Sequence, residues 1–361
     1  MPTLRLRDRD AIITKEGLIF RVFGYSHPPS AYICDVEYAP ETIFKSTDPR
    51  AFRNRGQEVF YKFYADEGWI FIQSKAPQYV IPHEMLGRKV VGVNYDNILE
   101  IRKPDVEFRK LVNNETGDGL VGAMRDVQKV IRQASGVSIE DFGVFGSLLH
   151  GFHNPMFSDI DLTIHGRTNI EKLRDTLREL YKTDSSQFRS EFETTQSIKK
   201  ENWRFKNLSP EEYVWHQRRK LIYALFEDEK TGRTIKTEFE PVKDWEEISS
   251  EYDSETKISP RGWSRMLACI KEDFDAPFIP SVYAIEPLKV LEGMREAQEV
   301  SRIVSYMEEF RIQAFQDEVV YVEGNLEEVT TSKGSFHQIA LTYCPRYYEQ
   351  VLKTAPDNKV L

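Results

Sequence analysis

The chain has 361 residues, too many for one ordinary domain, and this length predicts two or three domains. Its formal net charge of −9 argues against an indiscriminate nucleic-acid binder but leaves room for a local basic groove. Three widely separated cysteines fit neither a disulfide framework nor a metal cluster, and no apolar run is long enough to cross a membrane. We therefore expect a cytoplasmic protein with no membrane association and no disulfide partner.

Residues 1–103 predict a small, mostly β domain, either a barrel or a strongly curved sheet. Its strand-like segments, rich in aromatic and β-branched residues and separated by turn-formers, are residues 18–23, 31–36, 59–64 and 69–72. Arg50, Arg53 and Arg55 lie close to this aromatic run. The surface could stack single-stranded bases. Strand alternation turns half of the rings inward, however, and so favours a core with solvated arginines.

From Pro104 the pattern changes to helices. Apolar residues at helical spacing predict a helix over 120–134, with Asp118 as its N-cap and Gly136 as its stop. It leads into a predicted strand at 141–145. Further predicted elements are a helix at 169–181, a helix opened by the capping box Ser209-Pro210-Glu211-Glu212, and a hairpin of strands 221–227 and 234–242.

The centre of the chain combines a Gly-Ser turn with two nearby acids. Alternate residues of a strand share a face, so Asp159 and Asp161 are expected to point the same way. Two adjacent carboxylates repel each other, and a cation such as Mg²⁺ relieves the repulsion. Gly146 lets a backbone approach a ligand, and Ser147 offers a hydroxyl at a predicted helix N-terminus, which favours an anion such as a triphosphate. Together these features predict a site for phosphoryl transfer.

Residues 249–361 predict a second small β domain of mixed charge. The strand-like segments are residues 265–270, 281–285, 300–307, 319–323 and 336–343. Gly324-Asn325 and Lys333-Gly334 are expected to form turns between them.

The ordered motif carries a family resemblance. Gly146-Ser147, eleven intervening residues and Asp159-x-Asp161 resemble the signature of the DNA polymerase beta-like nucleotidyltransferase superfamily. Gly-Ser-Leu-Leu-x-Gly at 146–151 and Ser-Asp-Ile-Asp-Leu at 158–162 look like the predicted nucleotidyltransferases of archaea. The resemblance implies a central nucleotidyltransferase core, a mixed sheet with helices, which we place at 104–248. With the mostly-β domains read from the strand patterns at 1–103 and 249–361, the expected fold is α+β with three domains.

The resemblance also implies a set of metal-binding and catalytic acids. Asp159 and Asp161 would hold Mg²⁺ or Mn²⁺, and a third carboxylate, usually Asp, would lie on a neighbouring strand and help to deprotonate the attacking hydroxyl. The candidates here are Glu238 and Glu240, which share a face of the predicted second hairpin strand. Glu238 is favoured because it lies deeper in the strand and farther from Pro241. The alternative is a charged, exposed face on an edge strand.

Nucleotide binding is expected at Gly146, Ser147 and Ser158. Arg218 and Arg219 end the third helix, just before the acid-bearing hairpin. One interpretation is that they bind a triphosphate or an acceptor phosphate through bidentate contacts. The other is that they are cations favourably placed at a helix C-terminus.

The expected reaction transfers a nucleoside monophosphate from a nucleoside triphosphate such as ATP to an acceptor hydroxyl and releases pyrophosphate. The acceptor is an RNA end, a protein side chain or a small molecule, and the residues do not decide among these. Two alternatives stay open: a catalytically weak nucleotide-binding sensor, and an RNA-binding scaffold whose β domains carry the function.

Overall fold

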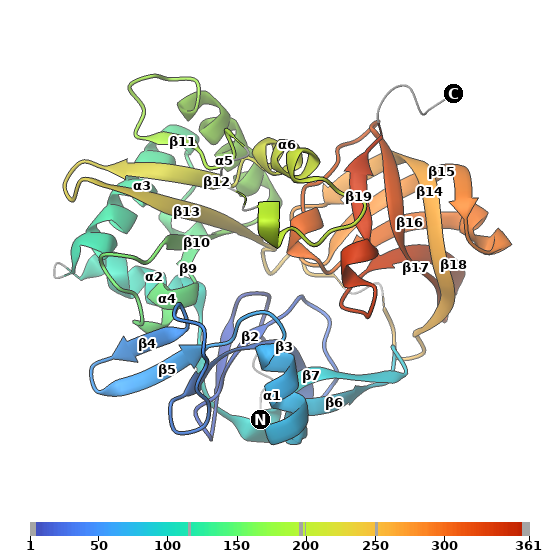
Figure 1. The fold of residues 1–361 in the computed structure, drawn as a ribbon, viewed down its shortest axis with the longest axis horizontal. Coiled ribbons are helices and arrows are strands. Elements are labelled where there is room, and N and C mark those ends of the chain that lie inside the picture. The colour runs from blue at the N-terminus through green and yellow to red at the C-terminus, as the bar shows by residue number, and fades with distance from the viewer. Residues whose placement is uncertain (1–4, 115–116, 195–197, 199, 250–251, 356–361) are drawn as a thin grey trace. The chain divides into compact units, whose positions relative to one another are not determined.

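The computed structural model describes residues 5–114, 117–194, 198, 200–249 and 252–355, which form helices and three β-sheets (Figure 1). Contacts divide the chain into two units. The first consists of Met1–Glu84, Arg88–Thr176 and Phe226–Ser250, and the second of Met85–Gly87, Leu177–Leu225 and Glu251–Leu361. The mixture of helices and sheets agrees with the predicted α+β class, while the predicted domain boundaries at 103 and 248 remain predictions.

The N-terminal part of the first unit is an eight-stranded sheet in the order β4-β5-β3-β2-β1-β8, with β7 paired to β3 and β6 paired to β7. The strands are β1 (Ala11–Thr14), β2 (Ile19–Val22), β3 (Ala31–Pro40), β4 (Phe52–Arg55), β5 (Glu58–Lys62), β6 (Val80–His83), β7 (Arg88–Asn94) and β8 (Ile98–Arg102). Phe20 and Tyr79 are fully buried in its core, with ring centroids 4.9 Å apart. The mostly-β character predicted for this region is confirmed.

One predicted strand of this region is wrong. Residues 69–72 lie in helix α1 (Glu67–Lys75), although their run of apolar residues suggests a strand. The buried positions of the helix are Gly68, Phe71 and Ile72, which follow the spacing of one helical face rather than strand alternation. Short apolar runs do not distinguish the two structures by composition, and here packing against the sheet decides.

The central region of the chain contains a five-stranded sheet in the order β11-β12-β13-β10-β9. Its strands are β9 (Phe142–Val144), β10 (Ile160–His165), β11 (Phe188–Ser190), β12 (Tyr223–Asp228) and β13 (Arg233–Val242). The helices of this part of the chain are α2 (Pro104–Asn113), α3 (Gly119–Ser135), α4 (Gly146–His150), α5 (Arg167–Leu180) and α6 (Pro210–Lys220). β10 runs parallel to β13 and antiparallel to β9. The boundary between the two units passes through α5 and β12.

The helix ends predicted from local residues are confirmed. The Asp118 side chain accepts hydrogen bonds from the backbone N–H groups of Leu120 and Val121, and Gly136 ends α3 with φ 71°. Ser209 and Glu212 form the reciprocal capping box that begins α6. These local contacts define where α3 begins and ends and where α6 begins.

The second unit contains a six-stranded sheet in the order β14-β15-β16-β18-β17-β19, and β14 also pairs with β17, so that the sheet closes on itself. Its strands are β14 (Lys257–Asp275), β15 (Ser281–Glu292), β16 (Val300–Ser305), β17 (Val319–Thr331), β18 (Gly334–Leu341) and β19 (Val351–Thr354). The predicted C-terminal β region is confirmed. In the described part of the chain, no helix is long and apolar enough to cross a bilayer.

The turn predicted at Gly324-Asn325 is wrong, because both residues lie inside β17. A Cβ atom on Gly324 would lie 2.5 Å from Cδ2 of Leu341. The glycine therefore allows close packing within a long strand rather than a change of chain direction.

Candidate active site

Two neighbouring strands place the predicted acids together. β10 and β13 pair in parallel, with Asp161 in register with Glu238 and Thr163 in register with Glu240. Residues in register on adjacent strands project from the same face of a sheet, so the Asp161 and Glu238 side chains lie next to each other. Asp159 is exposed and lies directly before β10. The structure thus brings Asp161 and Glu238 together at the start of β10, with Asp159 beside them in the chain.

The Gly-Ser turn lies directly against Asp161. The backbone N–H of Phe145 donates to the carbonyl oxygen of Asp161 at 3.1 Å. Gly146 follows with φ 59°, a conformation that favours glycine. A Cβ atom on Gly146 would lie 2.7 Å from Oδ2 of Asp161, so a larger residue would collide with the carboxylate. The glycine is therefore required by both its backbone conformation and its contact with the acid.

The electrostatics of this site concentrate negative charge. Burial, followed by the charge of Asp159, raises the pKa of Asp161 to about 7, and Glu240 acts in the same direction. Lys62, on β5 of the N-terminal sheet, opposes this rise in pKa. Asp161 thus has a near-neutral pKa and lies beside another acid. A bound cation would stabilise the ionised form of such a carboxyl group.

The donor atoms fit a hard divalent cation. Asp159, Asp161 and Glu238 offer carboxylate oxygens, the ligands that Mg²⁺ and Mn²⁺ prefer. Within the described ranges, no group of three or more His, Cys, Asp or Glu side chains is arranged to hold a metal ion. A cation at Asp159 and Asp161 would therefore complete its coordination with substrate phosphates and water.

The two predicted serines have defined surroundings. Ser147 is buried, and its carbonyl oxygen accepts from the backbone N–H of Phe152 at 2.9 Å. The hydroxyl of Ser158 accepts from the backbone N–H of Asn154 at 2.8 Å, and the carbonyl oxygen of Ser158 accepts from Arg233 at 3.3 Å. Ser158 therefore shapes the loop that leads into Asp159, and its contact with nucleotide stays a prediction.

Glu240 has a partner that sequence reasoning missed. Its carboxylate accepts two hydrogen bonds from the guanidinium of Arg9, one of them from Nε at 3.1 Å, and both residues are almost completely buried. Asp8 is a second acid near Arg9, with its Oδ2 3.8 Å from Nε of Arg9. A buried carboxylate that already has a buried arginine needs no cation. The pairing with Arg9 argues against Glu240 as the third carboxylate, whereas the charge of Glu240 still acts on Asp161, so the choice of Glu238 stays a prediction.

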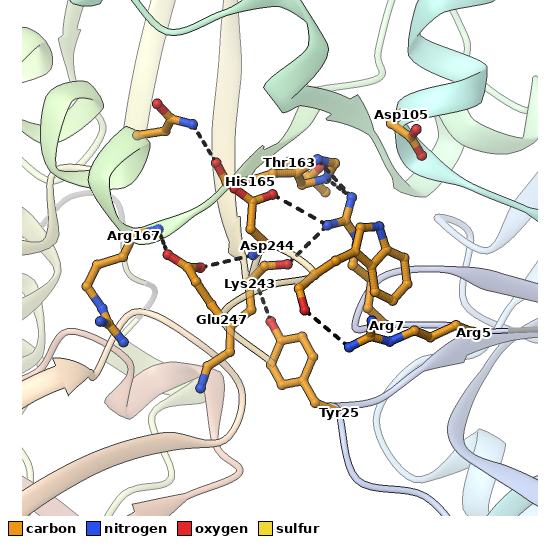
Figure 2. Close-up of polar contacts among 12 residues, drawn as sticks. Arg5, Arg7, Tyr25, Asp105, Thr163, His165, Arg167, Lys243, Asp244 and Glu247 are labelled. Atoms are coloured by element: carbon orange, nitrogen blue, oxygen red, sulfur yellow. Dashed lines mark hydrogen bonds and ion pairs between the residues drawn. The ribbon is translucent and has the colours of Figure 1, made fainter. Parts of the chain in front are cut away.

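Arg7 ties the far end of the same strands to the N-terminal segment (Figure 2). Its guanidinium donates to Nδ1 of His165 at 2.9 Å and to the carbonyl oxygen of Lys243 at 3.1 Å. The hydroxyl of Tyr25 accepts from the backbone N–H of Lys243 at 2.8 Å. Burial and the charge of Arg7 lower the pKa of His165 well below its usual range, so His165 is a neutral acceptor that packs here rather than a metal ligand.

The sequence contains a signal for this N-terminal contact. Arg5, Arg7 and Arg9 alternate in the sequence shortly before β1, a pattern that would put three cations on one side of an extended segment; in the structure residues 8 and 9 form a turn, and Arg9 has φ 71°. The guanidinium carbons of Arg5 and Arg7 lie 4.9 and 4.7 Å from the ring centroid of Trp245. Alternating arginines ahead of an apolar strand could have indicated a buried or stacked partner, although not which one.

Arg218 and Arg219 belong to the second unit. Arg219 forms an ion pair with Glu318 and donates to Oγ1 of Thr354 at 3.3 Å, while its guanidinium lies 4.2 Å from the ring centroid of Trp215. These contacts favour a structural role for Arg219, the alternative left open by the sequence. Contact of Arg218 and Arg219 with phosphate stays a prediction.

Comparison with known proteins identifies the class of the central region. Residues 124–230 match the nucleotidyltransferase domain family, which confirms the resemblance of this part of the chain to polymerase beta-like nucleotidyltransferases. The matched range contains Gly146, Ser147, Asp159 and Asp161 and ends before Glu238.

A relative extends the similarity to nearly the whole chain. The chain is 24% identical over 333 residues to the uncharacterized protein MJ1086 of Methanocaldococcus jannaschii, and the match covers 92% of this chain and 93% of the relative. Together with the family match, this archaeal relative confirms the resemblance of the central region to archaeal nucleotidyltransferases, and the similarity to the relative itself includes most of the flanking β regions. No solved structure matches the chain.

Proposed function

We propose that the protein is a divalent-metal-dependent nucleotidyltransferase that transfers a nucleoside monophosphate from a nucleoside triphosphate, ATP in the simplest case, to an acceptor hydroxyl. One arrangement carries the proposal: the Asp161 carboxylate packs against Gly146, lies in register with Glu238, and has its pKa raised to about 7 by burial and by Asp159. Phosphates can approach a glycine turn closely, and the acids next to it provide ligands for a cation.

The proposed reaction forms one bond and breaks one. The acceptor hydroxyl oxygen bonds to the α-phosphorus, and the bond from that phosphorus to the oxygen bridging the α- and β-phosphates breaks, so that pyrophosphate leaves with this oxygen. The hydroxyl proton passes to Glu238. A divalent cation held by Asp159 and Asp161 would supply neutralisation of the phosphate charge.

The residues of the chain orient the reactants in this proposal. Gly146 and Ser147 hold the triphosphate against the start of β10, and Ser158 keeps Asp159 in position through the loop contact described above. Arg9 keeps Glu240 paired, which leaves Asp161 and Glu238 as the acids that face the phosphates. An RNA end or a protein hydroxyl is the proposed acceptor, in a cytoplasmic setting.

Label transfer tests the proposal. The full chain is incubated in a cell extract with ATP labelled on the α-phosphate and with Mg²⁺ or Mn²⁺, and incorporation into macromolecules is measured. Asp159→Ala should abolish incorporation, whereas Glu229→Gln, which removes one exposed acid from the β12–β13 turn, should not change it. Undiminished incorporation by Asp159→Ala would contradict the proposal.

A binding measurement provides a readout independent of turnover. Mn²⁺ with ATP should raise the thermal unfolding midpoint of the wild type, because a ligand that binds the native state stabilises it. The rise should be much smaller in Asp161→Asn. An equal rise in both proteins would show that the cation and nucleotide bind elsewhere.

A nucleotide sensor is the second candidate function. It is favoured by a glutamate in place of the usual third aspartate and by the lack, within the described ranges, of three acids grouped for metal binding. A sensor would show the ATP-dependent rise in unfolding midpoint without incorporation of label into any acceptor.

A further inference from the structure

The β4–β5 hairpin presents several cations on one face. Its strands pair with Arg53 in register with Phe60 and Arg55 in register with Glu58. Because strand residues alternate between faces, Arg53, Arg55, Phe60 and Lys62 all project to the same side. We call Arg53, Arg55 and Lys62 the hairpin cations.

This face of the hairpin is turned toward the loop of the nucleotidyltransferase motif. The ring of Phe60 lies 4.6 Å from the ring of Phe152, measured between centroids. Cδ of Arg55 lies 3.5 Å from the position that a Cβ atom on Gly151 would take. Gly151 and Phe152 directly follow α4, the helix that begins at Gly146. The hairpin cations therefore lie along the segment that carries the Gly-Ser turn.

Lys62 is the hairpin cation closest to the acids. It is in register with Tyr38 of β3, whose ring lies 5.4 Å from the rings of both His150 and Phe152. The charge of Lys62 lowers the pKa of Asp161, and Asp161 in turn contributes to raising the pKa of Lys62. The positive face thus runs from the exposed end of the hairpin toward the acids.

The donors of this face are available to a ligand. Arg55 pairs with Glu58 at 3.0 Å, but the two side chains are 46% and 58% exposed, and exposed pairs of this kind contribute little stability. Nη1 of Arg53 donates to the backbone carbonyl oxygens of Arg50 and Phe52, at 2.5 and 2.8 Å, whereas its Nε is buried and has no hydrogen-bond partner among the residues that the structure describes. An anion bound at this face would replace Glu58 at Arg55 and add a charge-assisted contact to the guanidinium of Arg53.

The spacing of the cations selects the kind of anion. The backbone N–H of Lys62 donates to the carbonyl oxygen of Ala51, directly before β4, so along the hairpin the three cations follow one another at two-residue steps of about 7 Å, over roughly 14 Å. Adjacent phosphates of a triphosphate share a bridging oxygen and lie much closer together than this. Successive phosphates of a polynucleotide are separated by a whole sugar, which matches the steps better.

An exposed aromatic ring lies close to the acids in sequence. Phe157 is 82% exposed and precedes Asp159 by two residues. Exposed rings combined with a basic track are how proteins bind single strands, by base stacking and phosphate contacts.

We propose that the hairpin cations bind the backbone phosphates of a single-stranded polynucleotide whose terminal hydroxyl is the acceptor of the reaction. This inference rests on the proposed nucleotidyltransferase function for the role of that hydroxyl, although the binding itself is independent of turnover. In this proposal the N-terminal sheet provides the acceptor-binding surface next to the active site.

Oligonucleotide binding by the full chain tests this proposal without nucleotide or metal. The affinity for a short 5′-labelled single-stranded RNA is measured by fluorescence anisotropy over a range of salt concentrations. Arg53→Gln/Arg55→Gln should weaken binding several-fold and reduce the slope of log K against log salt by about 1.4, or about 0.7 for each lost phosphate contact. The matched control, Arg88→Gln/Lys89→Gln, removes two exposed cations from β7 of the same sheet and should leave binding unchanged.

Two further variants strengthen the test. Glu58→Gln removes the acid that pairs with Arg55 and should tighten RNA binding. Asp159→Ala should retain RNA affinity even though it abolishes transfer, so a failure of catalysis is distinguished from a failure of acceptor binding. A single-stranded DNA of the same sequence should respond like the RNA to the arginine changes, because the contacts are to phosphates.

Three results would overturn the proposal. One is the absence of RNA binding by the wild type at low salt. Another is equal binding by Arg53→Gln/Arg55→Gln and the β7 control. The third is a loss of ATP affinity in Arg53→Gln/Arg55→Gln with RNA affinity intact, which would assign the hairpin cations to the triphosphate instead.

Discussion

The two ends of the β10–β13 pair differ in how their charges are balanced. At the start of β10, which we call the acid end, Asp161 lies in register with Glu238, and neighbouring acids help to raise its pKa. At the other end, which we call the tied end, two arginines of the N-terminal segment make the contacts: Arg9 donates to Glu240, and Arg7 donates to His165. At the tied end, the negative charge of the strands is therefore balanced by arginine. At the acid end, negative charge is in excess, and this is where a cation and phosphates are proposed to bind.

The largest expected effect separates the two glutamates of β13. Glu238→Gln should lower the rate of label incorporation by about 10²–10⁴-fold, the range for loss of a general base. Glu240→Gln should lower it by less than about 10-fold, because its partner is Arg9 rather than the substrate. Initial rates at saturating ATP measure both. The opposite ranking would make Glu240 the third carboxylate.

Breaking the tied end should cost stability rather than catalysis. Arg9→Met leaves Glu240 buried without its arginine, and loss of one partner of a buried pair costs about 3–5 kcal/mol. The loss is measured as the change in the free energy of unfolding by urea, taken from the transition of the first unit. The double variant Arg9→Met/Glu240→Met should recover most of it, because no buried charge is left behind. A cost below about 1 kcal/mol for Arg9→Met would show that the pair is not needed.

A third prediction concerns the pH dependence of stability near the tied end. Burial raises the pKa of Asp10 to about 7, against the opposing charge of Lys103 and a hydrogen bond from the backbone N–H of Arg7. Because the native protein keeps a proton that the unfolded chain loses at lower pH, wild-type stability should fall as the pH rises from about 4 to 7. Asp10→Asn should therefore be more stable than the wild type at pH 8, by about 1–4 kcal/mol.

The gain from Asp10→Asn should disappear as the pH falls through this window toward 4. Chemical denaturation at several pH values measures it, and the asparagine can still accept from the backbone N–H of Arg7. A gain that did not change with pH would indicate a packing effect instead.

The smallest expected effect is the loss of one hydrogen bond. Tyr25→Phe removes the hydroxyl that accepts from the backbone N–H of Lys243 and should cost about 1 kcal/mol. Tyr64→Phe is the matched control, because its hydroxyl makes a long, exposed contact of 3.4 Å with the carbonyl oxygen of Arg50. Both are compared by thermal unfolding. Equal stability of the two variants would argue against a contribution from Tyr25 to the tied end.

Local chemistry made much of this fold predictable. Asp118, Gly136 and the Ser209–Glu212 capping box defined helix ends through contacts within a few residues, and the structure contains them. The expectation that Asp159 and Asp161 share a face used only the two-residue period of a strand and stays a prediction, because β10 begins at Ile160. Signals of this kind need no knowledge of which segments meet.

The features missed from sequence depend on distant partners. Residues 69–72 have the composition of a strand, and only packing against the N-terminal sheet makes them helical. Gly324 resembles a turn glycine until its close contact with Leu341 is known. The pairing of Arg9 with Glu240 joins positions 231 residues apart, and no local pattern specifies it.

The discontinuity of the first unit has a consequence for how the chain is made. Its last segment, Phe226–Ser250, contains β13. In the sequence it comes after Leu177–Leu225, which belong to the second unit. A nascent chain therefore holds the complete Gly146–Asp161 motif long before the strand that must cover one edge of β10 has been synthesised. Distant pairings form slowly, and an uncovered strand edge invites association with other chains. A fragment cut at residue 230, where the family match ends, would keep the motif and lose β13, so we expect it to aggregate rather than fold.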